Sequence, residues 1–372
     1  MSGPRVLVVA QQLRRRVPGG IGTYARALLH GLAALSEDDG GRPGTPDGAA
    51  PAVSVYASRA PSGGAGDPLA RLGYPVVASR LPGPLLTRAW DRGLVRAPAG
   101  FDVVHSVSLA APPARGVPEV VTVHDVAWRH RPDAYDRRGR RWHEAAFTRA
   151  LGRAAHLVVP SEPVARDVTA AGADAGAVSV IAPGSDHLPP PDDAAAGALL
   201  ASKGVTGPFV LSVGTIEPRK NLPRLFAAYQ SARRSMAEPL PLVVVGPVGW
   251  GPDVGTGEGV VFAGRVGDAT LAALYRRARL LAYVPLEEGY GLPPLEAMYL
   301  GTPVVSSAVP GAGTASLTVE PTDVEQMARA IVEVASDHAL RARLVAAGRA
   351  HAAGLTWAAT ARAHARLWAS LP

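Results

Sequence analysis

The chain contains 372 residues with a formal net charge of +7, and 47% of its residues are apolar. This length predicts two domains, and a charged fraction of 19% excludes an intrinsically disordered chain. Because cysteine is absent, disulfides, thiolate metal sites and cysteine nucleophiles are excluded. The chain has neither an apolar run of the roughly 18 residues that span a membrane nor a signal-peptide core, so we expect a cytoplasmic protein.

The 38 basic residues outnumber the 31 acidic residues, which favours anionic partners. Nearly all basic side chains are arginine, since lysine occurs only at Lys203 and Lys220 and the one asparagine is Asn221. This bias is typical of GC-rich coding sequences, so a single arginine carries little information. We therefore expect the arginine run at residues 14–16 to be solvated, whereas the adjacent Lys220 and Asn221 are informative.

An apolar run at residues 6–9 predicts the first strand of a parallel sheet. A glycine-bearing loop at residues 19–22 follows, and alanines and leucines then predict a helix with Thr23 as its N-cap. Segments 36–52 and 58–68 are rich in Gly, Pro, Ala and Asp without periodicity, so we interpret them as mobile surface insertions.

Further strands alternate with helical patterns, which predicts parallel α/β sheets. In the first half they are expected at residues 53–56, 103–105, 120–124, 157–160 and 178–181. In the second half they are expected at residues 209–213, 242–245, 260–262, 280–284 and 303–305. Because residues 188–193 form the best linker, we expect domains at 1–190 and 191–355, and a helix within 356–372 that crosses back to the first domain.

The stretch from residue 285 to 298 reads as a strand end, a glycine turn and a short helix. Exposed N–H groups at the start of such a helix, with its positive dipole end, can bind phosphate. Glu288 would lie in the turn and Glu296 on the first helical turns, where carboxylates can accept hydrogen bonds from sugar or ribose hydroxyls. From spacing alone, two solvated acids remain an equally good interpretation.

A second motif, Gly-Thr-Ile-Glu-Pro-Arg-Lys-Asn, begins at Gly214 directly after the strand predicted at 209–213. Two cations at a strand end, Arg219 and Lys220, can neutralise a departing diphosphate without a metal. An Arg-Lys pair is by itself more often a solvated surface feature. Its position after a strand, in a chain that has so few lysines, favours a site.

These motifs resemble those of a known family. Glu288 and Glu296, within Glu-Gly-Tyr-Gly-Leu-Pro-Pro-Leu-Glu-Ala-Met, resemble the Glu-x7-Glu signature of retaining glycosyltransferases of family 4. The segment that begins at Gly214 and the His-Asp segment at His124 are most similar to those of mannosyl- and rhamnosyl-type members. The resemblance implies the GT-B fold, an α/β fold in which two Rossmann-like domains have parallel sheets facing a central cleft. The first domain would bind the acceptor and the second the nucleotide-sugar donor.

The resemblance also implies roles for individual residues. Arg219 and Lys220 would hold the donor diphosphate, Glu288 would orient donor-sugar hydroxyls, and Glu296 would bind the ribose. The backbone positions expected to contact the donor are Gly20, Gly22, Gly214, Gly289, Tyr290, Gly291 and Leu292. His124, in Val-His-Asp at a strand end, resembles the histidine that faces the donor sugar, although a lone histidine is more often structural.

The reaction implied is the retaining, metal-independent transfer of a hexose or deoxyhexose from a nucleoside diphosphate sugar, with a GDP-sugar mildly favoured. The acceptor would be a hydroxyl of a glycan, a lipid-linked intermediate or a secondary metabolite. No cofactor or metal is expected, since no Asp-x-Asp and no metal-ligand spacing is present. One departure from the family is the short segment 308–315, which lacks the usual Pro-Glu-Val turn and leaves sugar selectivity open.

Three alternatives remain. A sugar-nucleotide epimerase or phosphorylase would use the same diphosphate site without a sugar acceptor. A dinucleotide-binding oxidoreductase is suggested by G-x-G-x-x-A at residues 20–25, but these glycines follow the first strand by about ten residues, too far for that fingerprint. The basic stretch 129–153 lacks the aromatic pattern of a nucleic-acid binder, so we expect contact with an anionic membrane surface instead.

Overall fold

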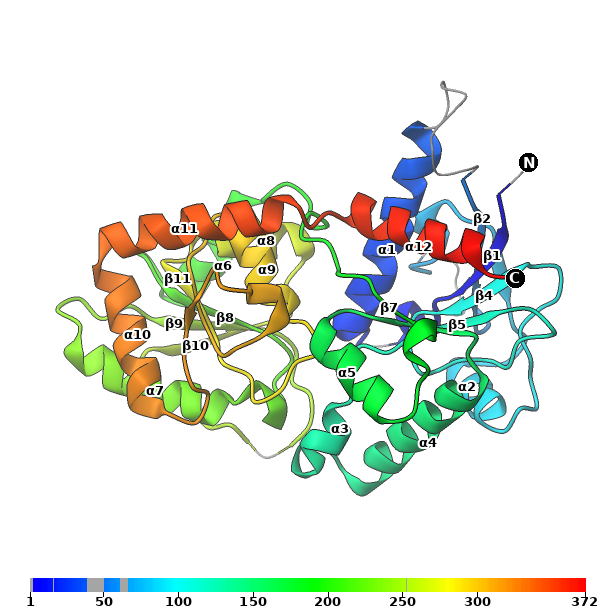
Figure 1. The fold of residues 1–372 in the computed structure, drawn as a ribbon. Coiled ribbons are helices and arrows are strands. Elements are labelled where there is room, and N and C mark those ends of the chain that lie inside the picture. The colour runs from blue at the N-terminus through cyan, green and yellow to red at the C-terminus, as the bar shows by residue number, and fades with distance from the viewer. Residues whose placement is uncertain (1–2, 16, 39–49, 61–65, 252) are drawn as a thin grey trace. The chain divides into compact units, whose positions relative to one another are not determined.

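The computed structural model describes the chain except for residues 1–2, 16, 39–49, 61–65 and 252. The chain divides into two compact units (Figure 1). Unit 1 combines Met1–Arg129, Tyr135–Gly184 and Trp357–Pro372, and unit 2 combines His130–Ala134 and Ser185–Thr356. Large parts of the two segments predicted to be mobile insertions, 36–52 and 58–68, lie outside the described residues.

Unit 1 is built on a parallel sheet with the strand order β3-β2-β1-β4-β5-β6-β7. Residues 6–9 of the first strand are buried, as expected for a strand covered on both faces. The strand predicted at residues 120–124 ends at Thr122, so His124 follows the strand instead of ending it. The strands are β1 Arg5–Val9, β2 Ala52–Ala57, β3 Val76–Ala78, β4 Val103–Ser106, β5 Glu119–Thr122, β6 His156–Val159 and β7 Val178–Val180.

The first helix begins earlier than the sequence predicts. Gly20 and Gly22 lie in its first turns, not in a loop, and Thr23 is inside the helix, not its N-cap. Pro18 explains the difference, because its carbonyl accepts from the Gly22 N–H at 3.1 Å and a Cβ on Gly22 would lie 2.2 Å from the proline ring. The helices of this half are α1 Gly19–Asp38, α2 Gly83–Asp91, α3 Ala127–His130, α4 Arg137–Arg153, α5 Glu162–Ala170 and, from the C-terminus, α12 Trp357–Ser370.

Arg14, predicted to belong to a solvated run, is buried. Its guanidinium pairs with Asp67, and the two side chains are only 3% and 9% exposed. The Arg14 Nε donates to Asp67 Oδ1 at 3.0 Å, and a further guanidinium N–H reaches the Ser58 carbonyl. The hydrogen bond from Arg14 lowers the pKa of Asp67. The prediction was wrong for Arg14 because a run of arginines does not show which of them pairs with a carboxylate in the folded chain. Residue 16 of the run lies outside the described residues.

A buried polar network ties α12 to the rest of unit 1. The His364 Nδ1 donates to the Thr360 carbonyl at 2.8 Å, which leaves Nε2 to accept from the Tyr24 hydroxyl of α1 at 3.0 Å. The His105 ring stacks on His364 with ring centroids 5.3 Å apart, and its Nε2 lies 2.8 Å from the Thr122 hydroxyl. The C-terminal helix is thus packed on α1 and joined to β4 and β5 (Figure 1).

This network predicts acid sensitivity. Burial lowers the pKa of His364 to about 4. Burial also lowers the pKa of His105 well below its usual value, and the neighbouring histidines act in the same direction. Since the unfolded chain binds these protons near pH 6.5, stability present at pH 7 is lost as the pH falls. We expect the free energy of unfolding to drop by about 2 kcal/mol for His364 alone between pH 7 and pH 5.

Urea unfolding followed by tryptophan fluorescence measures this, because five of the six tryptophans, all except Trp250, belong to unit 1. His364→Gln should have a shallower pH dependence than the unchanged protein. His338→Gln, at an exposed position on α11, is the control and should change nothing. An equally steep pH dependence in His364→Gln would contradict the assignment.

Unit 2 is also built on a parallel sheet, with the order β10-β9-β8-β11-β12-β13. Alternate residues pack on opposite faces: Leu211 and Val243 belong to one buried cluster, Val210 and Leu242 to another. The strands are β8 Val210–Val213, β9 Leu242–Val245, β10 Val260–Gly264, β11 Leu280–Tyr283, β12 Val304–Ser306 and β13 Leu317–Thr318. The helices are α6 Asp193–Ser202, α7 Leu222–Ser235, α8 Asp268–Arg277, α9 Leu292–Tyr299, α10 Val324–Ser336 and α11 His338–Ala353.

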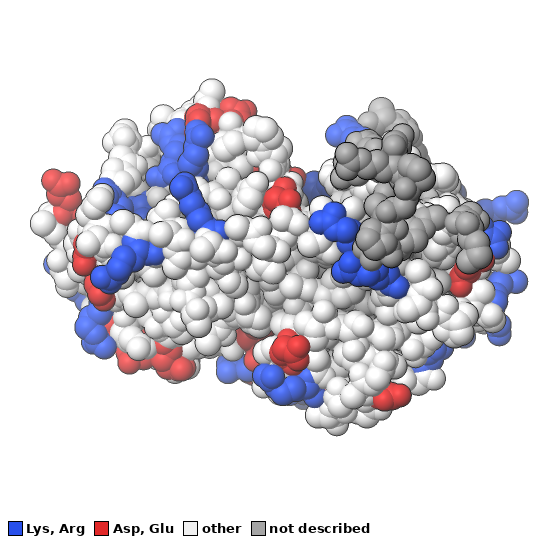
Figure 2. Space-filling model, turned by 45° about the horizontal axis from the view of Figure 1, so that its top comes forward, with Lys and Arg blue, Asp and Glu red and all other residues white. Residues whose placement is uncertain are grey.

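The predicted α/β class with two parallel sheets is therefore confirmed. The sequence did not indicate β3 or β13, which are edge strands of three and two residues. Within the described part of the chain no helix is long and apolar enough to cross a membrane. On the face drawn in Figure 2, basic side chains are scattered with acidic ones among them, and the described surface shows no single continuous basic area there.

Candidate functional site

Two glycines meet at the carboxyl ends of β8 and β9. Gly214 follows β8 and Gly246 follows β9 with φ of +149°. A Cβ on Gly246 would lie 1.9 Å from the Gly214 carbonyl oxygen, so the two backbones touch and only glycine fits at residue 246. The Gly246 N–H donates to the Gly264 carbonyl at 2.9 Å. Sequence reasoning selected Gly214 but missed Gly246, although that glycine also directly follows a predicted strand.

Asn221 fixes the turn that carries the two predicted cations. It has φ of +59°, in the left-handed region where asparagine is one of the few tolerated side chains. Its amide donates to the carbonyls of Val284 at 3.0 Å and Pro321 at 2.7 Å, and its oxygen accepts from Arg224 at 3.1 Å. This buried residue thus connects the turn at Pro218–Lys220 with the end of β11.

Arg219 and Lys220 converge on one carboxylate. The Lys220 Nζ pairs with Glu288 Oε1 and donates to the Tyr283 hydroxyl at 3.0 Å. The Arg219 Nη1 lies 3.3 Å from the same Glu288 oxygen, while its Nη2 lies 3.0 Å from Glu217 Oε1. The four charged side chains are at most 14% exposed. The structure therefore brings together three of the four predicted catalytic residues.

The charges of this cluster hold one another in place. Burial would raise the pKa of Glu288, but the charges of Arg219 and Lys220 outweigh it and lower the pKa. Burial would lower the pKa of Lys220, but the Glu288 carboxylate raises it instead. Burial dominates at Glu217 and raises its pKa. The cluster thus holds two cations, Arg219 and Lys220, against the carboxyl groups of Glu288 and Glu217.

The glycine turn before α9 is closed by the shortened segment. Gly291, with φ of +95°, caps α9, which begins at Leu292. The Gly311 N–H donates to the Tyr290 carbonyl at 2.6 Å, and a Cβ on Gly311 would lie 2.4 Å from the Gly291 oxygen. The segment 308–315 therefore packs directly on the turn that includes Gly289. Gly311 was not predicted, because its role depends on a contact between segments far apart in the sequence.

Glu296, on α9, contacts residues of two other segments. Its Oε2 accepts from the Tyr275 hydroxyl of α8 at 2.7 Å, and its Oε1 lies 3.2 Å from the His187 Nε2. The residue is 6% exposed, so the interpretation as a solvated acid is wrong for this position. No sequence motif indicated Tyr275 or His187.

The remaining predicted residues, His124, Gly20 and Gly22, belong to unit 1. The His124 Nε2 donates to the Val107 carbonyl at 2.9 Å, and the Tyr24 ring contacts His124 edge-on at 4.8 Å between centroids. Burial lowers the pKa of His124, although the Val107 carbonyl acts in the opposite direction. This imidazole is therefore neutral at pH 7.

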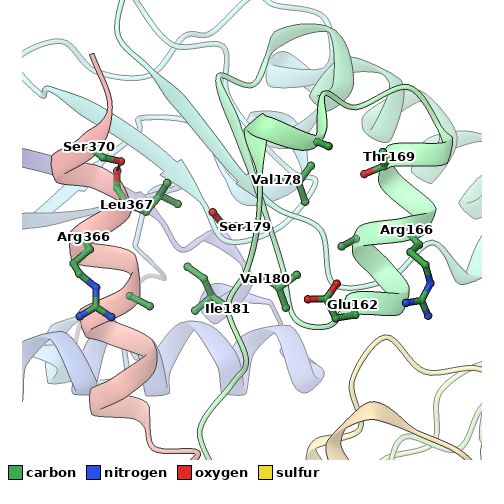
Figure 3. A pocket seen from close by; sticks show the side chains of 13 residues that line it. Glu162, Arg166, Thr169, Val178, Ser179, Val180, Ile181, Arg366, Leu367 and Ser370 are labelled. Atoms are coloured by element: carbon green, nitrogen blue, oxygen red, sulfur yellow. Dashed lines mark hydrogen bonds between the residues drawn. The ribbon is translucent and has the colours of Figure 1, made fainter.

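A groove of about 990 Å³ lies elsewhere in unit 1, along the edge strand β7 between α5 and α12. Figure 3 shows Arg166 and Arg366 on opposite sides of the strand, with Ser179 between them. No predicted site residue lines it. Among the described residues, no group of three or more His, Asp or Glu side chains is arranged to hold a metal ion.

Comparisons of the sequence agree with these motifs. Residues 18–187 match the family model "Glycosyltransferase Family 4", and residues 201–351 match "Glycosyl transferases group 1". O-antigen chain mannosyltransferase B of Escherichia coli is 38% identical over 161 residues, 40% of this chain and 42% of that protein. D-inositol 3-phosphate glycosyltransferase of Salinispora arenicola is 31% identical over 320 residues, 74% of this chain and 71% of that protein. The match thus spans less than half of the first relative and most of the second.

Solved structures share the fold. HepE of Anabaena in complex with UDP and glucose has a TM-score of 0.70 at 19% identity, covering 99% of this chain and 100% of that chain. Sucrose-phosphate synthase of Thermosynechococcus elongatus has a TM-score of 0.73 at 20% identity, covering 98% of both chains. The fold is that of the GT-B glycosyltransferases. With the sequence matches, the chain belongs to glycosyltransferase family 4, a family of enzymes.

The Gly214–Gly246 contact generates a prediction. Gly246→Ala should lower the stability of unit 2 by about 2 kcal/mol or more, because the new methyl adds a backbone clash to a strained φ. Gly264→Ala is the matched control, since Gly264 has φ of +69° but open space around its Cβ position, and it should cost about 1 kcal/mol. Urea unfolding followed by far-UV circular dichroism measures both. Equal losses would show that the close approach does not constrain residue 246.

Proposed function

We propose that this chain transfers a hexose or deoxyhexose from a nucleoside diphosphate sugar to an acceptor hydroxyl, with retention of configuration and without a metal. The observation that carries the proposal is the pairing of Arg219 and Lys220 with the one Glu288 oxygen, beside the glycine turn that opens α9. Two buried cations at the carboxyl ends of parallel strands lie where α/β folds bind ligands.

In this proposal the two cations stabilise the negative charge that develops on the leaving diphosphate. Their charge is fixed before the donor arrives, because Glu288 holds both side chains in place. A preorganised pair costs no reorganisation during bond cleavage, which is how electrostatic catalysis lowers a barrier. The positive end of α9 adds to the same effect. The anomeric configuration would be retained if the acceptor hydroxyl attacks the anomeric carbon from the same side as the departing diphosphate. The leaving phosphate would then take the proton of that hydroxyl.

Glu288 and His124 are proposed to contact the donor sugar. Glu288 would contact sugar hydroxyls while its carboxylate stays paired with Arg219 and Lys220 through Oε1. His124 is neutral at pH 7 and its Nε2 is held by the Val107 carbonyl, which suits a residue that shapes a pocket more than a proton carrier. Gly214, Gly289, Tyr290 and Leu292 would supply backbone contacts to the donor, as would the first turn of α1.

A GDP-sugar remains the favoured donor, and the similarity to mannosyltransferases supports it. The acceptor is proposed to be a glycan, a lipid-linked intermediate or a small molecule.

Calorimetric titration tests the donor site without an acceptor. We expect GDP or UDP to bind in the presence of EDTA and NAD not to bind. Lys220→Ala should weaken nucleotide binding about 10- to 100-fold, because a charged hydrogen-bond donor to the diphosphate is lost. Lys203→Ala removes the other lysine of the chain, which is exposed, and is the control.

Binding of NAD alone, or equal affinity in Lys220→Ala and Lys203→Ala, would contradict the proposed site. Once an acceptor is identified, the anomeric proton coupling of the product shows directly whether the configuration is retained.

The proposed membrane contact can be located on two helices of unit 1. Several arginines of the stretch 129–153 are paired with acids, among them Arg149 with Asp91, but Arg138 and Arg141 are exposed on α4. Asp91 ends α2 and also accepts from Trp142 of α4 at 3.0 Å, so the two helices lie side by side (Figure 1).

The region of α2 also exposes apolar side chains. Leu85 is 50% exposed and Leu94, just after the helix, is 75% exposed. Surfaces that expose both basic side chains and leucines are typical of proteins that bind anionic lipid. We propose that this surface holds the enzyme at the inner face of a cytoplasmic membrane.

Vesicle flotation tests the membrane proposal. The protein should float with phosphatidylglycerol-containing vesicles and not with phosphatidylcholine alone. Replacing Arg138 and Arg141 by alanine should weaken that binding about tenfold or more, at about 1 kcal/mol for each basic side chain near the surface. The control replaces two exposed arginines of unit 2, Arg329 and Arg343. No preference for anionic vesicles would remove the proposal.

A further inference from the structure

The Glu296 carboxylate is held on both oxygens by side chains from two different parts of unit 2. The Tyr275 hydroxyl, from α8, donates to Oε2 at 2.7 Å. The His187 Nε2, from the segment that enters unit 2 at Ser185, lies 3.2 Å from Oε1. Exposure is 7% for the Glu296 side chain, 8% for that of His187 and 0% for Tyr275. Glu296 is therefore a built acceptor pair in the interior and not a mobile surface acid.

The hydrogen-bond directions at this carboxylate are fixed by chemistry. An ionised carboxylate only accepts, so the Nε2 of His187 carries a proton and the Tyr275 hydroxyl donates. Burial and the charge of Glu296 raise the pKa of Tyr275 well above its usual value, which keeps the hydroxyl protonated.

Two donors from separate elements prevent the carboxylate from rotating. Each oxygen has two lone pairs, and each of these contacts uses one of them. One lone pair on each oxygen can then accept from a ligand. Two acceptors at a fixed spacing match two adjacent hydroxyls, which a ribose has at its 2′ and 3′ positions. A carboxylate free to rotate would present the same atoms without that fixed geometry, and ordering it on binding would cost affinity.

We propose that His187 and Tyr275 are positioning residues that orient Glu296 to accept from both ribose hydroxyls, which makes the chain selective for ribonucleoside diphosphate sugars over 2′-deoxyribonucleoside donors. This inference rests on the proposed function, in which Glu296 contacts the donor ribose. It narrows the donor class, because a dTDP-sugar lacks the 2′-hydroxyl. A site built to pair two hydroxyls rejects an analogue that leaves one buried acceptor unpaired.

Calorimetry with matched nucleotides tests the inference. The probes are GDP and UDP, each compared with its 2′-deoxy form, with EDTA present. We expect the unchanged protein to bind the ribonucleotide about 10- to 100-fold more tightly, as for a lost hydrogen bond to a charged acceptor. Tyr275→Phe and His187→Leu should each reduce that ratio at least threefold. His187→Gln, whose amide nitrogen can occupy the Nε2 position, should restore most of it.

Tyr229→Phe is the control for Tyr275→Phe. Tyr229 is an equally buried tyrosine of unit 2 whose hydroxyl donates to the Leu240 carbonyl at 2.8 Å, so its loss should lower stability but leave the ratio unchanged. If His187 and Tyr275 have a purely structural role, each variant should bind the ribonucleotide and the deoxyribonucleotide more weakly by the same factor.

The two failures are distinguishable. If the unchanged protein binds no nucleoside diphosphate, the proposed function falls and this inference falls with it. If it binds ribonucleotide and deoxyribonucleotide equally, or if its preference survives unaltered in Tyr275→Phe and His187→Leu, the donor site stands and the inference is overturned. Should His187→Leu not fold, Tyr275→Phe and His187→Gln carry the comparison.

Discussion

The pairing of Glu288 with Arg219 and Lys220 is the interaction on which the candidate site depends. It joins the turn after β8 to the turn after β11. Lys220 and Glu288, in these two turns, are 68 residues apart in the sequence. Removing three charges from water is costly, and a buried ion pair is weak as a source of stability. Beside a glycine turn and a helix start, the pairing suits the role that we propose for it, which is to hold two cations where an anion binds.

The backbone around this cluster is shaped by close approaches that leave no room for side chains. Gly246 touches Gly214 on one side, and Gly311 touches Gly291 on the other. Asn221 adopts a left-handed conformation, and its side-chain amide donates hydrogen bonds to two carbonyls of neighbouring loops. These close contacts constrain the backbone of the turns near the charged side chains. A larger residue at Gly246, Gly311 or Asn221 would displace the adjacent turn and the charged side chains near it. The positions of the charges therefore depend on the close packing of the backbone.

The sequence predicted most of the fold because its signals are local. Buried strands such as residues 242–245 are continuous apolar runs, and the observed β9 has the same bounds. Glu288, Arg219 and Lys220 could be selected because each stands in a motif at a strand end. His187 and Tyr275 could not, since their roles arise from contacts with Glu296 across 109 and 21 residues, which no periodicity encodes.

The errors have the same origin. Gly20 and Gly22 resemble a loop in composition, yet the carbonyl and ring of Pro18 place them in a helix. Arg14 is one of a run of arginines, yet Asp67 lies 53 residues away and buries it. The residue type indicates only a preference for a local structure or for solvent exposure. The contacts formed in the tertiary structure determine which conformation and which environment the residue adopts. In an arginine-rich chain, charge is for this reason a poor guide to which cations do chemistry.

The chain passes between its two units at four points, and two of these are Gly184–Ser185 and Thr356–Trp357. These two connections are tied together, because the Ser185 N–H and hydroxyl both donate to the Leu355 carbonyl, at 2.8 and 2.9 Å. His187 lies two residues beyond Ser185, so the residue that holds Glu296 belongs to one of the connections. Any change of backbone conformation there that displaces its imidazole would release one oxygen of Glu296. By linkage, a ligand bound to Glu296 in the held state would in turn favour the conformation of the connection that keeps His187 in place.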